Sequence, residues 1–188
     1  MTPPHLQARP IRGLTLRHPW AWCVTTLGKR TENRSWHPSK AGLQIGEYLA
    51  IHGGKFSPAP AYRQEILDAA SWVAETVFSH DPAPYEALGI LAGLQGEYGT
   101  PEFCRAVSPQ GIVGVARLAG CLAPGTLTDD PWYTGDYGWL LEDFVPMKEP
   151  VPHRGAQGCW PLEPHALIEV RRQYRAARST ASPARNPS

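Results

Sequence analysis

The run from Gly111 to Leu122, GIVGVARLAGCL, constrains the fold most strongly. It is apolar along most of its length and rich in β-branched residues, which pack well on a pleated surface. A run of this kind predicts a central strand of a β-sheet. The 20 prolines and 18 glycines among 188 residues indicate many turns and loops. This composition favours a β-barrel over a helical bundle.

Shorter patterns on either side of this run predict the remaining elements. Extended segments are expected at Gly13–Arg17, Arg30–Trp36, Gly46–His52, Tyr137–Val145 and Cys159–Leu162. The last of these belongs at a sheet edge, because Pro161 has no N–H to donate. Helices are expected at Trp20–Leu27, Pro60–Ser79, Tyr85–Leu94 and Glu163–Arg178. The final helix is amphipathic and turns Leu167, Val170 and Tyr174 inward.

These elements predict a single domain over residues 11–178, with a helical insertion at about residues 56–109. The segments 1–10 and 179–188 are rich in proline and small polar residues, and we expect them to be flexible tails.

The charge balance gives no support for non-specific binding to polyanions. The net charge is +1, from 18 Lys+Arg against 17 Asp+Glu, whereas such binding normally needs a basic excess. The basic residues gather locally near the C-terminus, at Arg171, Arg172, Arg175, Arg178 and Arg185. We interpret this run as a solvated helix face, with contact to backbone phosphates as the less favoured alternative.

Cysteine and histidine spacing gives no sign of a metal site. The four cysteines form no C-x-x-C pair, and the seven histidines show no H-x-x-x-H or H-E-x-x-H spacing. We therefore predict no metal and no cofactor. There is also no N-terminal signal pattern and no apolar run near the ~18 residues that a membrane span needs. We expect a cytoplasmic protein with reduced thiols and no membrane partner.

Two segments near the N-terminus resemble the start of the ASCH domain (activating signal cointegrator homology). These are LTLRHPWA at residues 14–21 and KRTENRSW at residues 29–36. The hallmark of that family is G-x-K-x-x-E-x-R, and Lys29, Glu32 and Arg34 match its spacing. The glycine departs from it, because Leu27 holds its place and Gly28 stands one residue late. The shift falls at the helix end, where we expect it to adjust the cap and leave the cleft intact.

Further blocks follow in the family's order. They are AIHGGK at 50–55, GIVGVARL at 111–118, YGWLLED at 137–143 and GAQGCW at 155–160. The resemblance implies an α+β fold, namely a PUA-like mixed β-barrel flanked by helices, with the helical insertion and the C-terminal helix added. It also implies a cleft that takes RNA, DNA or a nucleotide-like small molecule, because PUA-like domains are associated with nucleic acids and modified bases.

The residues of the motif suit such a ligand chemically. Lys29 supplies a mobile point cation, and Arg34 supplies a planar fork for phosphate or a base edge. The Glu32 carboxylate can hold either cation in place, or accept from an exocyclic amine. On a regular strand Glu32 would point away from Lys29, so a bend is needed to bring both into one cleft. The alternative is a surface ion-pair cluster, worth ~0–1 kcal/mol per pair.

Aromatic and histidine side chains complete the candidate site. Trp20 and Trp36 offer flat faces for stacking on a base, although Trp36 is equally well explained as a packing residue. His18 precedes the first helix and either contacts ligand or solvates the turn. His52 and Lys55 end a strand beside glycines, where loops often hold sites, and His52 is equally well a core histidine. We interpret Trp22, Trp72, Trp132 and Trp160 as packing residues.

A nucleic-acid or nucleotide binding module, using the cleft beside the first helix, is the leading hypothesis. The alternative is an amidohydrolase, because a bacterial branch of the family that resembles this chain at the lysine hydrolyses N4-acetylcytidine. Lys29 would be the base or nucleophile there, together with Glu32. That branch has a threonine where Glu32 stands, and a carboxylate favours the charged ammonium over the attacking amine. The sequence leaves the partner glutamate open between Glu97 and Glu142.

Two further hypotheses rank lower. A metal-dependent nuclease would need the aspartates at 129, 130 and 136, but this loop also fits a turn with capping chemistry. A protein-interaction adaptor would use the insertion or the C-terminal tail, and the sequence does not indicate a protein partner.

Overall fold

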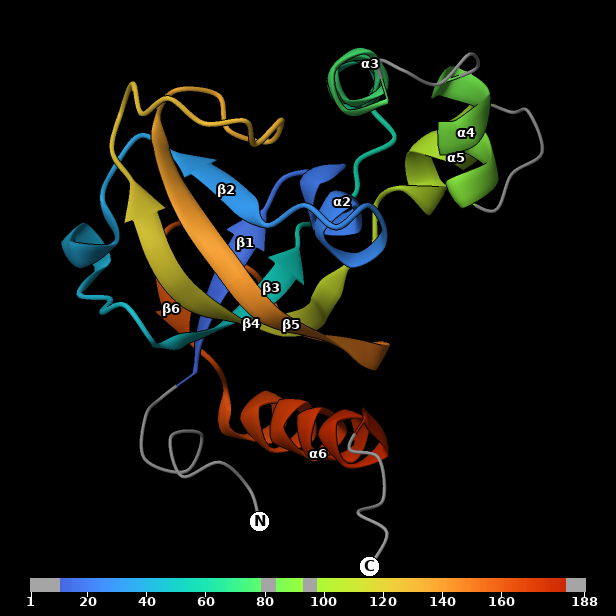
Figure 1. The fold of residues 1–188 in the computed structure, drawn as a ribbon. Coiled ribbons are helices and arrows are strands. Elements are labelled where there is room, and N and C mark those ends of the chain that lie inside the picture. Colours follow the sequence, from blue (N-terminus) through green and yellow to red (C-terminus); the bar gives the residue numbers. More distant parts are fainter. Residues whose placement is uncertain (1–10, 79–83, 93–97, 182–188) are drawn as a thin grey trace, which may run out of the picture.

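The computed structural model describes residues 11–78, 84–92 and 98–181. Its centre is a mixed six-stranded sheet in the order β2-β5-β4-β3-β1-β6. The sheet curls strongly into a half-barrel (Figure 1). Its strands are β1 (Arg12–Leu16), β2 (Thr31–Arg34), β3 (Tyr48–Gly53), β4 (Gly111–Leu122), β5 (Tyr137–Val151) and β6 (Cys159–Pro161). The fold is therefore α+β, as the sequence predicts, and the barrel is open between its edge strands β2 and β6.

The long strands β4 and β5 produce the curl. Their antiparallel register shifts at three places, and the β3–β4 register shifts once more between Ile51 and His52. Each such irregularity bends a strand and increases its twist. The only parallel pair among the described strands joins β1 to β3. The predicted central strand is confirmed with its bounds, since β4 lies inside the sheet between β5 and β3.

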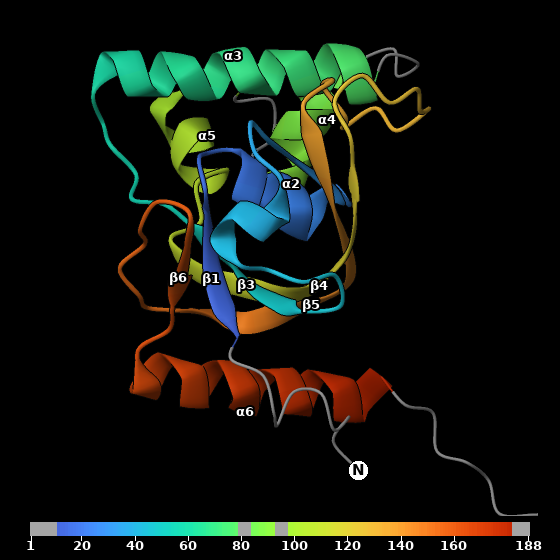
Figure 2. The same cartoon turned by 90° about the vertical axis from the view of Figure 1, so that its left-hand side faces the viewer.

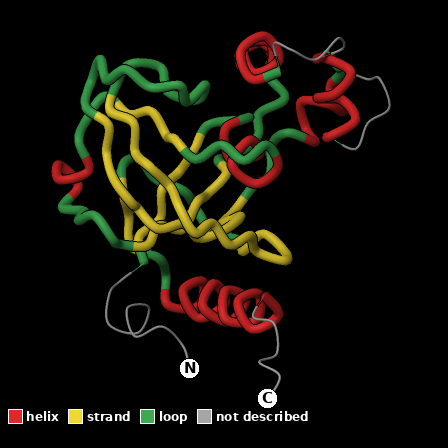
Figure 3. The backbone as a smooth tube through the Cα atoms, viewed as in Figure 1, coloured by secondary structure: helices red, strands yellow, loops and turns green. Residues whose placement is uncertain are grey.

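Helices lie on both sides of the sheet. The helix α6 (Pro164–Ala181) lies below the sheet, and α3 (Pro60–Val77) lies above it (Figure 2). Together with α3, α4 (Pro84–Leu91) and α5 (Pro101–Ala106) form the helical insertion between β3 and β4. The remaining elements are α2 (Trp20–Thr26), between β1 and β2, and the short 3-10 helix η1 (Pro38–Ala41). Figure 3 shows the strands gathered between the two helical regions.

Side chains of β4 face two different cores. Ile112 and Val115 pack with Val170 and Tyr174 of α6. Val113, Ala116 and Leu118 pack inside the curl of the sheet. Strict alternation would place Ile112 and Val115 on opposite faces, because they are three residues apart. The register shift between Ile112 and Gly114 interrupts the alternation and accounts for their shared core. The inward face predicted for the C-terminal helix is confirmed, because Val170 and Tyr174 are buried and Leu167 packs beside them.

A third core fixes the insertion to α2. Trp22 and Cys23 of α2 pack with Ile66, Ala70 and Val73 of α3. The insertion is thereby held beside the first helix, and the motif residues follow the end of this helix. It is more than a thickening of one side, because α3 supplies one wall of a cavity described below.

Several element bounds differ from the sequence-based ones. β5 continues to Val151, six residues beyond the predicted end, because it pairs with β4 as far as Ile112. α5 has no counterpart in the pattern analysis; it is short and is capped by the Thr100 side chain, which accepts from the Phe103 N–H. α6 reaches Ala181, so residues 179–181 are helical. The rest of the two predicted tails, residues 1–10 and 182–188, lies outside the described residues. Within the described part of the chain, no helix is long and apolar enough to cross a membrane.

Candidate ligand cavity beside the first helix

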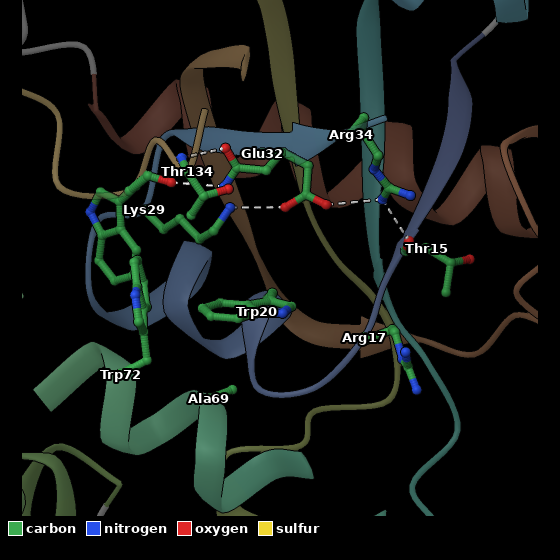
Figure 4. A pocket seen from close by; sticks show the side chains of 11 residues that line it. Thr15, Arg17, Trp20, Lys29, Glu32, Arg34, Ala69, Trp72 and Thr134 are labelled. Carbon is green, nitrogen blue, oxygen red and sulfur yellow. Dashed lines mark hydrogen bonds and ion pairs between the residues drawn. The ribbon is translucent and has the colours of Figure 1, made fainter. Parts of the chain in front are cut away.

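A cavity of about 430 Å³ opens beside α2, and it is called the Lys29 cavity below. Its walls come from β1, α2, β2, α3 and the loop between β4 and β5 (Figure 4). The residues that line it are Thr15, Arg17, Trp20, Lys29, Glu32, Asn33, Arg34, Ala69, Trp72, Trp132 and Thr134. The cavity therefore brings together the three motif residues, Lys29, Glu32 and Arg34, and one of the two predicted stacking residues, Trp20.

A bend at the end of α2 places Lys29 and Glu32 together. Gly28 has φ +72°, a left-handed conformation that ends helices readily when the residue is glycine. The backbone N–H of Lys29 then donates to the carbonyl of Cys23 at 3.1 Å. Because β2 begins only at Thr31, Lys29 is free of the strand's alternation. The bend that the motif required is present, one residue later than in the family pattern.

The three charged side chains form a continuous chain of contacts across the cavity (Figure 4). Lys29 Nζ lies 2.8 Å from one Glu32 carboxylate oxygen, and an Arg34 terminal nitrogen lies 3.0 Å from the other. Lys29 also donates to the carbonyl of Thr31. Arg34 donates to the carbonyl of Thr15 at 3.0 Å. Glu32 thus holds both cations at once, where the sequence left open which one it would hold.

Burial distinguishes these three linked side chains from an ordinary surface ion-pair cluster. The side chains of Lys29, Glu32 and Arg34 are 3%, 9% and 20% exposed. At such burial the charges are poorly screened, and each one depends on its partners. Capacity for a ligand remains: an ammonium has three donors, and a carboxylate accepts at about four positions. In addition, Arg34 Nε is buried and has no hydrogen-bond partner among the described residues.

Tryptophans form the apolar wall. The rings of Trp20 and Trp72 meet edge to face at 5.8 Å, and those of Trp72 and Trp132 lie 6.4 Å apart. The Lys29 ammonium lies 5.8 Å from the Trp20 ring centroid. Trp72 and Trp132 pack as predicted, yet they also line the cavity, which the sequence reasoning missed. The sequence held no signal for this role, because both lie far from the motif along the chain.

Asp130 and Asn33 fix the loop that presents Trp132. Asp130 accepts from the Thr31 hydroxyl and, at 2.9 Å, from the Trp132 N–H. The Asn33 side chain donates to the Trp132 carbonyl at 2.8 Å and accepts from the Thr134 N–H at 3.0 Å. These contacts tie the loop to β2 and agree with the turn interpretation of the aspartate loop. Among the described residues, no group of three or more His, Cys, Asp or Glu side chains is arranged to hold a metal ion.

The structure places Trp36 and Trp22 away from the Lys29 cavity. Trp36 meets Trp139 edge to face at 4.7 Å, and its carbonyl accepts from Trp139 Nε1 at 3.1 Å. Trp36 lies outside the set of lining residues. Trp22 is buried in the core between α2 and α3, as expected. The adjacent Cys23 is also buried, which raises the pKa of its thiol to about 12 despite the nearby Lys29.

His18 and His52 are both buried histidines held by backbone carbonyls. Nε2 of His18 lies 2.8 Å from the Gly54 carbonyl, and Nε2 of His52 lies 2.9 Å from the His153 carbonyl. In each ring Nδ1 is buried and has no hydrogen-bond partner in the part of the chain that the structure describes. Burial is the main cause that lowers the pKa of both histidines. His18 lies beside the Tyr62 ring and does not line the Lys29 cavity.

A second cavity of about 940 Å³ adjoins the first, and it is called the Lys55 groove below. It contains His52 and Lys55, the two remaining residues of the predicted site. Both cavities share Thr15, Arg17 and Arg34. The Lys55 groove is completed by the Gly53–Gly54 end of β3, Gln110 and Gly111 at the start of β4, and the loop of residues 153–158. Six of the eight predicted site residues thus line the two joined cavities, whereas His18 and Trp36 line neither.

Of the two candidate partner glutamates, the structure describes Glu142, which does not join Lys29. Glu142 pairs with Arg117 at 2.6 Å and is exposed outside the Lys29 cavity. Glu97 lies outside the described residues. Glu32 is the only carboxylate among the residues that line the cavity. The C-terminal arginines that the structure describes lie on α6, where Arg172 pairs with Glu169 at 2.6 Å.

Comparison of the sequence with family models and with curated proteins finds no match. The fold and the cavity by themselves define an α+β half-barrel protein with an aromatic-walled, charge-lined cavity beside its first helix.

Proposed function

We propose that this chain is an ASCH-type, PUA-like protein that binds a nucleobase in the Lys29 cavity, as part of RNA, DNA or a nucleotide-like ligand. The observation that carries this proposal is the joint presence of three cations, one carboxylate and three tryptophans in one cavity. A base needs the same combination, because it has a flat face for stacking and an edge of donors and acceptors.

Each lining group has a counterpart on a base. The Glu32 carboxylate accepts from an exocyclic amine, and the free donors of Lys29 and Arg34 are suited to carbonyl or ring-nitrogen acceptors. The tryptophan wall at Trp20 and Trp72 supports stacking, worth ~1–3 kcal/mol per base in single-strand binders. A volume of about 430 Å³ falls within the range of small-ligand sites of about 300–1,000 Å³ and suits one extruded base.

The buried ion pairs support recognition because they hold the polar groups in place before a ligand arrives. Lys29 and Arg34 are each fixed by Glu32 and by one backbone carbonyl. The edge of a ligand therefore meets donors and an acceptor at fixed positions, and the entropic cost of ordering these side chains on binding is smaller. This favours a role in specificity over a role in non-specific attraction.

Titration of single-stranded RNA and DNA oligonucleotides tests the proposal. We expect salt-sensitive binding by the wild-type protein and at least a tenfold loss of affinity in Lys29→Met, which keeps the length of the side chain. Because this substitution leaves Glu32 with one partner fewer, circular dichroism must show that the variant is folded. Lys148→Met, outside the Lys29 cavity, is the matched control. No binding at micromolar protein, or equal binding by Lys29→Met, would refute the proposal.

A second candidate is hydrolysis of N4-acetylcytidine, because Lys29 and Glu32, the two residues that this reaction would use, lie 2.8 Å apart in one cavity. Their ion pair favours the charged ammonium, so Lys29 would have to lose a proton before it could act as base or nucleophile. In this reaction water adds to the acetyl carbon, the bond from carbon to N4 breaks, and N4 takes up a proton to give cytidine and acetate. Incubation of the protein with N4-acetylcytidine, followed by chromatography, separates the two functions. Formation of cytidine by the wild-type protein and not by Lys29→Met would establish the hydrolytic activity. If the substrate stays unchanged, the binding function is the remaining proposal.

A further inference from the structure

The charged side chains that line the Lys55 groove are positive. Its lining includes Arg17, Arg34, Lys55 and Arg154, and no aspartate or glutamate of the described residues lines it. The whole chain has a net charge of only +1, so this is a local concentration of positive charge. Walls of one sign focus the electrostatic field and attract ligands of the opposite sign.

Two of these cations are free to meet a ligand. Among the described residues, no hydrogen bond or ion pair joins the side chains of Lys55 or Arg154 to any other group, and both residues are exposed. Arg17 differs, since it pairs with Glu65 of α3 at 2.6 Å, and Arg34 pairs with Glu32. The groove therefore offers unneutralised cations at its outer part and a paired arginine where it meets the Lys29 cavity.

The loop at residues 153–158 brings backbone close to the floor of the groove. A Cβ at Gly155 would lie 2.6 Å from His52 Cε1 and 2.7 Å from Thr15 Oγ1. Only glycine permits so close an approach. Within the described structure, the N–H groups of residues 154–157 donate to no protein acceptor. Free backbone N–H groups next to arginine and lysine suit the oxygens of a phosphate group.

The loop is also held firmly at its start. The His153 carbonyl lies 2.9 Å from His52 Nε2, and the His153 ring stacks on Trp160 with centroids 4.5 Å apart. Nε2 of the His153 ring accepts a hydrogen bond from the Glu163 N–H at 3.1 Å. The backbone that presents Arg154 is thus positioned before a ligand binds, which lowers the entropic cost of binding.

We propose that the Lys55 groove binds the phosphate groups of the nucleotide whose base occupies the Lys29 cavity. The link is Arg34, which lines both cavities together with Thr15 and Arg17. Figure 4 shows these three residues at the end of the Lys29 cavity away from Trp72. This inference rests on the proposed function, and it adds that the ligand is phosphorylated, as a mononucleotide or as a strand, and is not a free nucleoside.

Calorimetric titration of a graded ligand series tests the inference. The probes are cytidine, adenosine, their 5′-monophosphates and oligo(C) and oligo(A) of two and six nucleotides. We expect each monophosphate to bind about tenfold more tightly than its nucleoside, a gain typical of hydrogen bonds to charged groups. A further gain on the dinucleotide would assign the groove to a strand; no further gain would assign it to a mononucleotide.

The double variant Lys55→Ala/Arg154→Ala separates the groove from the cavity. It is expected to lose the preference for phosphate while its nucleoside affinity stays unchanged. In salt titrations of the hexanucleotide, the slope of log K against log salt should fall in magnitude by about 1.4, from ~0.7 for each of two lost contacts. Lys148→Ala/Arg175→Ala, which removes two exposed cations outside both cavities, is the matched control.

The outcomes distinguish the two proposals. Nucleoside binding without any gain from phosphate, or a phosphate preference that the Lys55→Ala/Arg154→Ala variant keeps, overturns this inference and leaves the base cavity standing. Failure to bind any nucleoside, nucleotide or oligonucleotide overturns the proposed function as well.

Discussion

The Lys29 cavity and the Lys55 groove use charge in opposite ways. In the Lys29 cavity the charges are buried and paired, and tryptophans surround them. In the Lys55 groove two of the cations are exposed and unpaired among the described residues, and glycines surround them. Buried pairs fix geometry and respond little to salt, whereas exposed cations provide long-range attraction that salt screens. The Lys29 cavity is thus suited to specificity, and the Lys55 groove is suited to electrostatic attraction of a ligand.

The largest expected effect comes from breaking the buried pairs. Glu32→Ala leaves Lys29 and Arg34 as like charges without their shared carboxylate, so we expect the free energy of unfolding to fall by about 3–5 kcal/mol. Urea denaturation followed by circular dichroism measures the change. Glu142→Ala, which breaks an exposed pair with Arg117, should cost no more than about 1 kcal/mol. Equal losses in the two variants would show that burial does not distinguish the sites.

A smaller effect is expected from the aromatic wall. Trp72→Ala removes a stacking face contributed by the insertion. We expect affinity for single-stranded oligonucleotides to fall by about 5- to 150-fold, from ~1–3 kcal/mol per base. Fluorescence anisotropy measures the change. Trp36→Ala is the contrasting variant, because Trp36 packs on Trp139 and lies outside the cavity. A greater loss of affinity in Trp36→Ala than in Trp72→Ala would contradict the assignment of the wall.

Stability should also depend on pH through the two buried histidines. Burial lowers the pKa of His18 and of His52 below the ordinary value of 6.5. The unfolded chain therefore binds more protons than the folded one below about pH 6.5. The stability from the neutral rings is fully present above that pH and is lost as the pH falls through the folded-state pKa values.

Melting temperatures between pH 7.5 and pH 5 measure this dependence. Protonation of Nδ1 would place a charged donor without a partner in the interior, next to Tyr62 for His18 and next to Trp160 and His153 for His52. We expect His18→Gln and His52→Gln to flatten the profile. The exposed His165 provides the control, and a steep profile that persists in both variants would assign it to other groups.

The smallest effect is expected from the exposed pair between Arg17 and Glu65. Their side chains are 74% and 53% exposed, although they meet at 2.6 Å. Glu65→Ala should therefore change the free energy of unfolding by no more than about 1 kcal/mol, and less at high salt. The same substitution leaves Arg17 unpaired beside the Lys55 groove, so oligonucleotide affinity should rise slightly at low salt. A fall in affinity would show that the pair is needed to hold α3 over the cavity.

Periodic patterns in the sequence predicted most of the fold. β4 was predictable with its bounds because a long apolar, β-branched run has few alternatives. β6 was predictable as an edge strand from Pro161, and α6 from its amphipathic spacing. The extension of β5 to Val151 was not predictable, because residues 146–151 are mostly polar or proline. They form a strand only because β4 offers hydrogen-bond partners beside them.

The candidate site was predictable in its charged part and not in its aromatic part. Lys29, Glu32 and Arg34 are close along the chain, and their spacing with one bend suffices to bring them together. Trp72 and Trp132 reach the same cavity from an insertion and from a distant loop, so no local pattern could indicate them. Trp36 is near the motif but turns onto Trp139, which shows that sequence proximity is a poor guide to a shared pocket.

The sequence by itself determined most strands and the terminal helix, because these follow from short-range periodicity. It indicated the three charged residues through their resemblance to the ASCH motif. Only the tertiary structure decided that Glu32 holds two cations at once, that the insertion supplies a tryptophan wall, and that Lys55 and Arg154 line one groove. The physical reason is that packing and pairing between distant segments depend on the curl of the sheet, which no local stretch of the chain encodes.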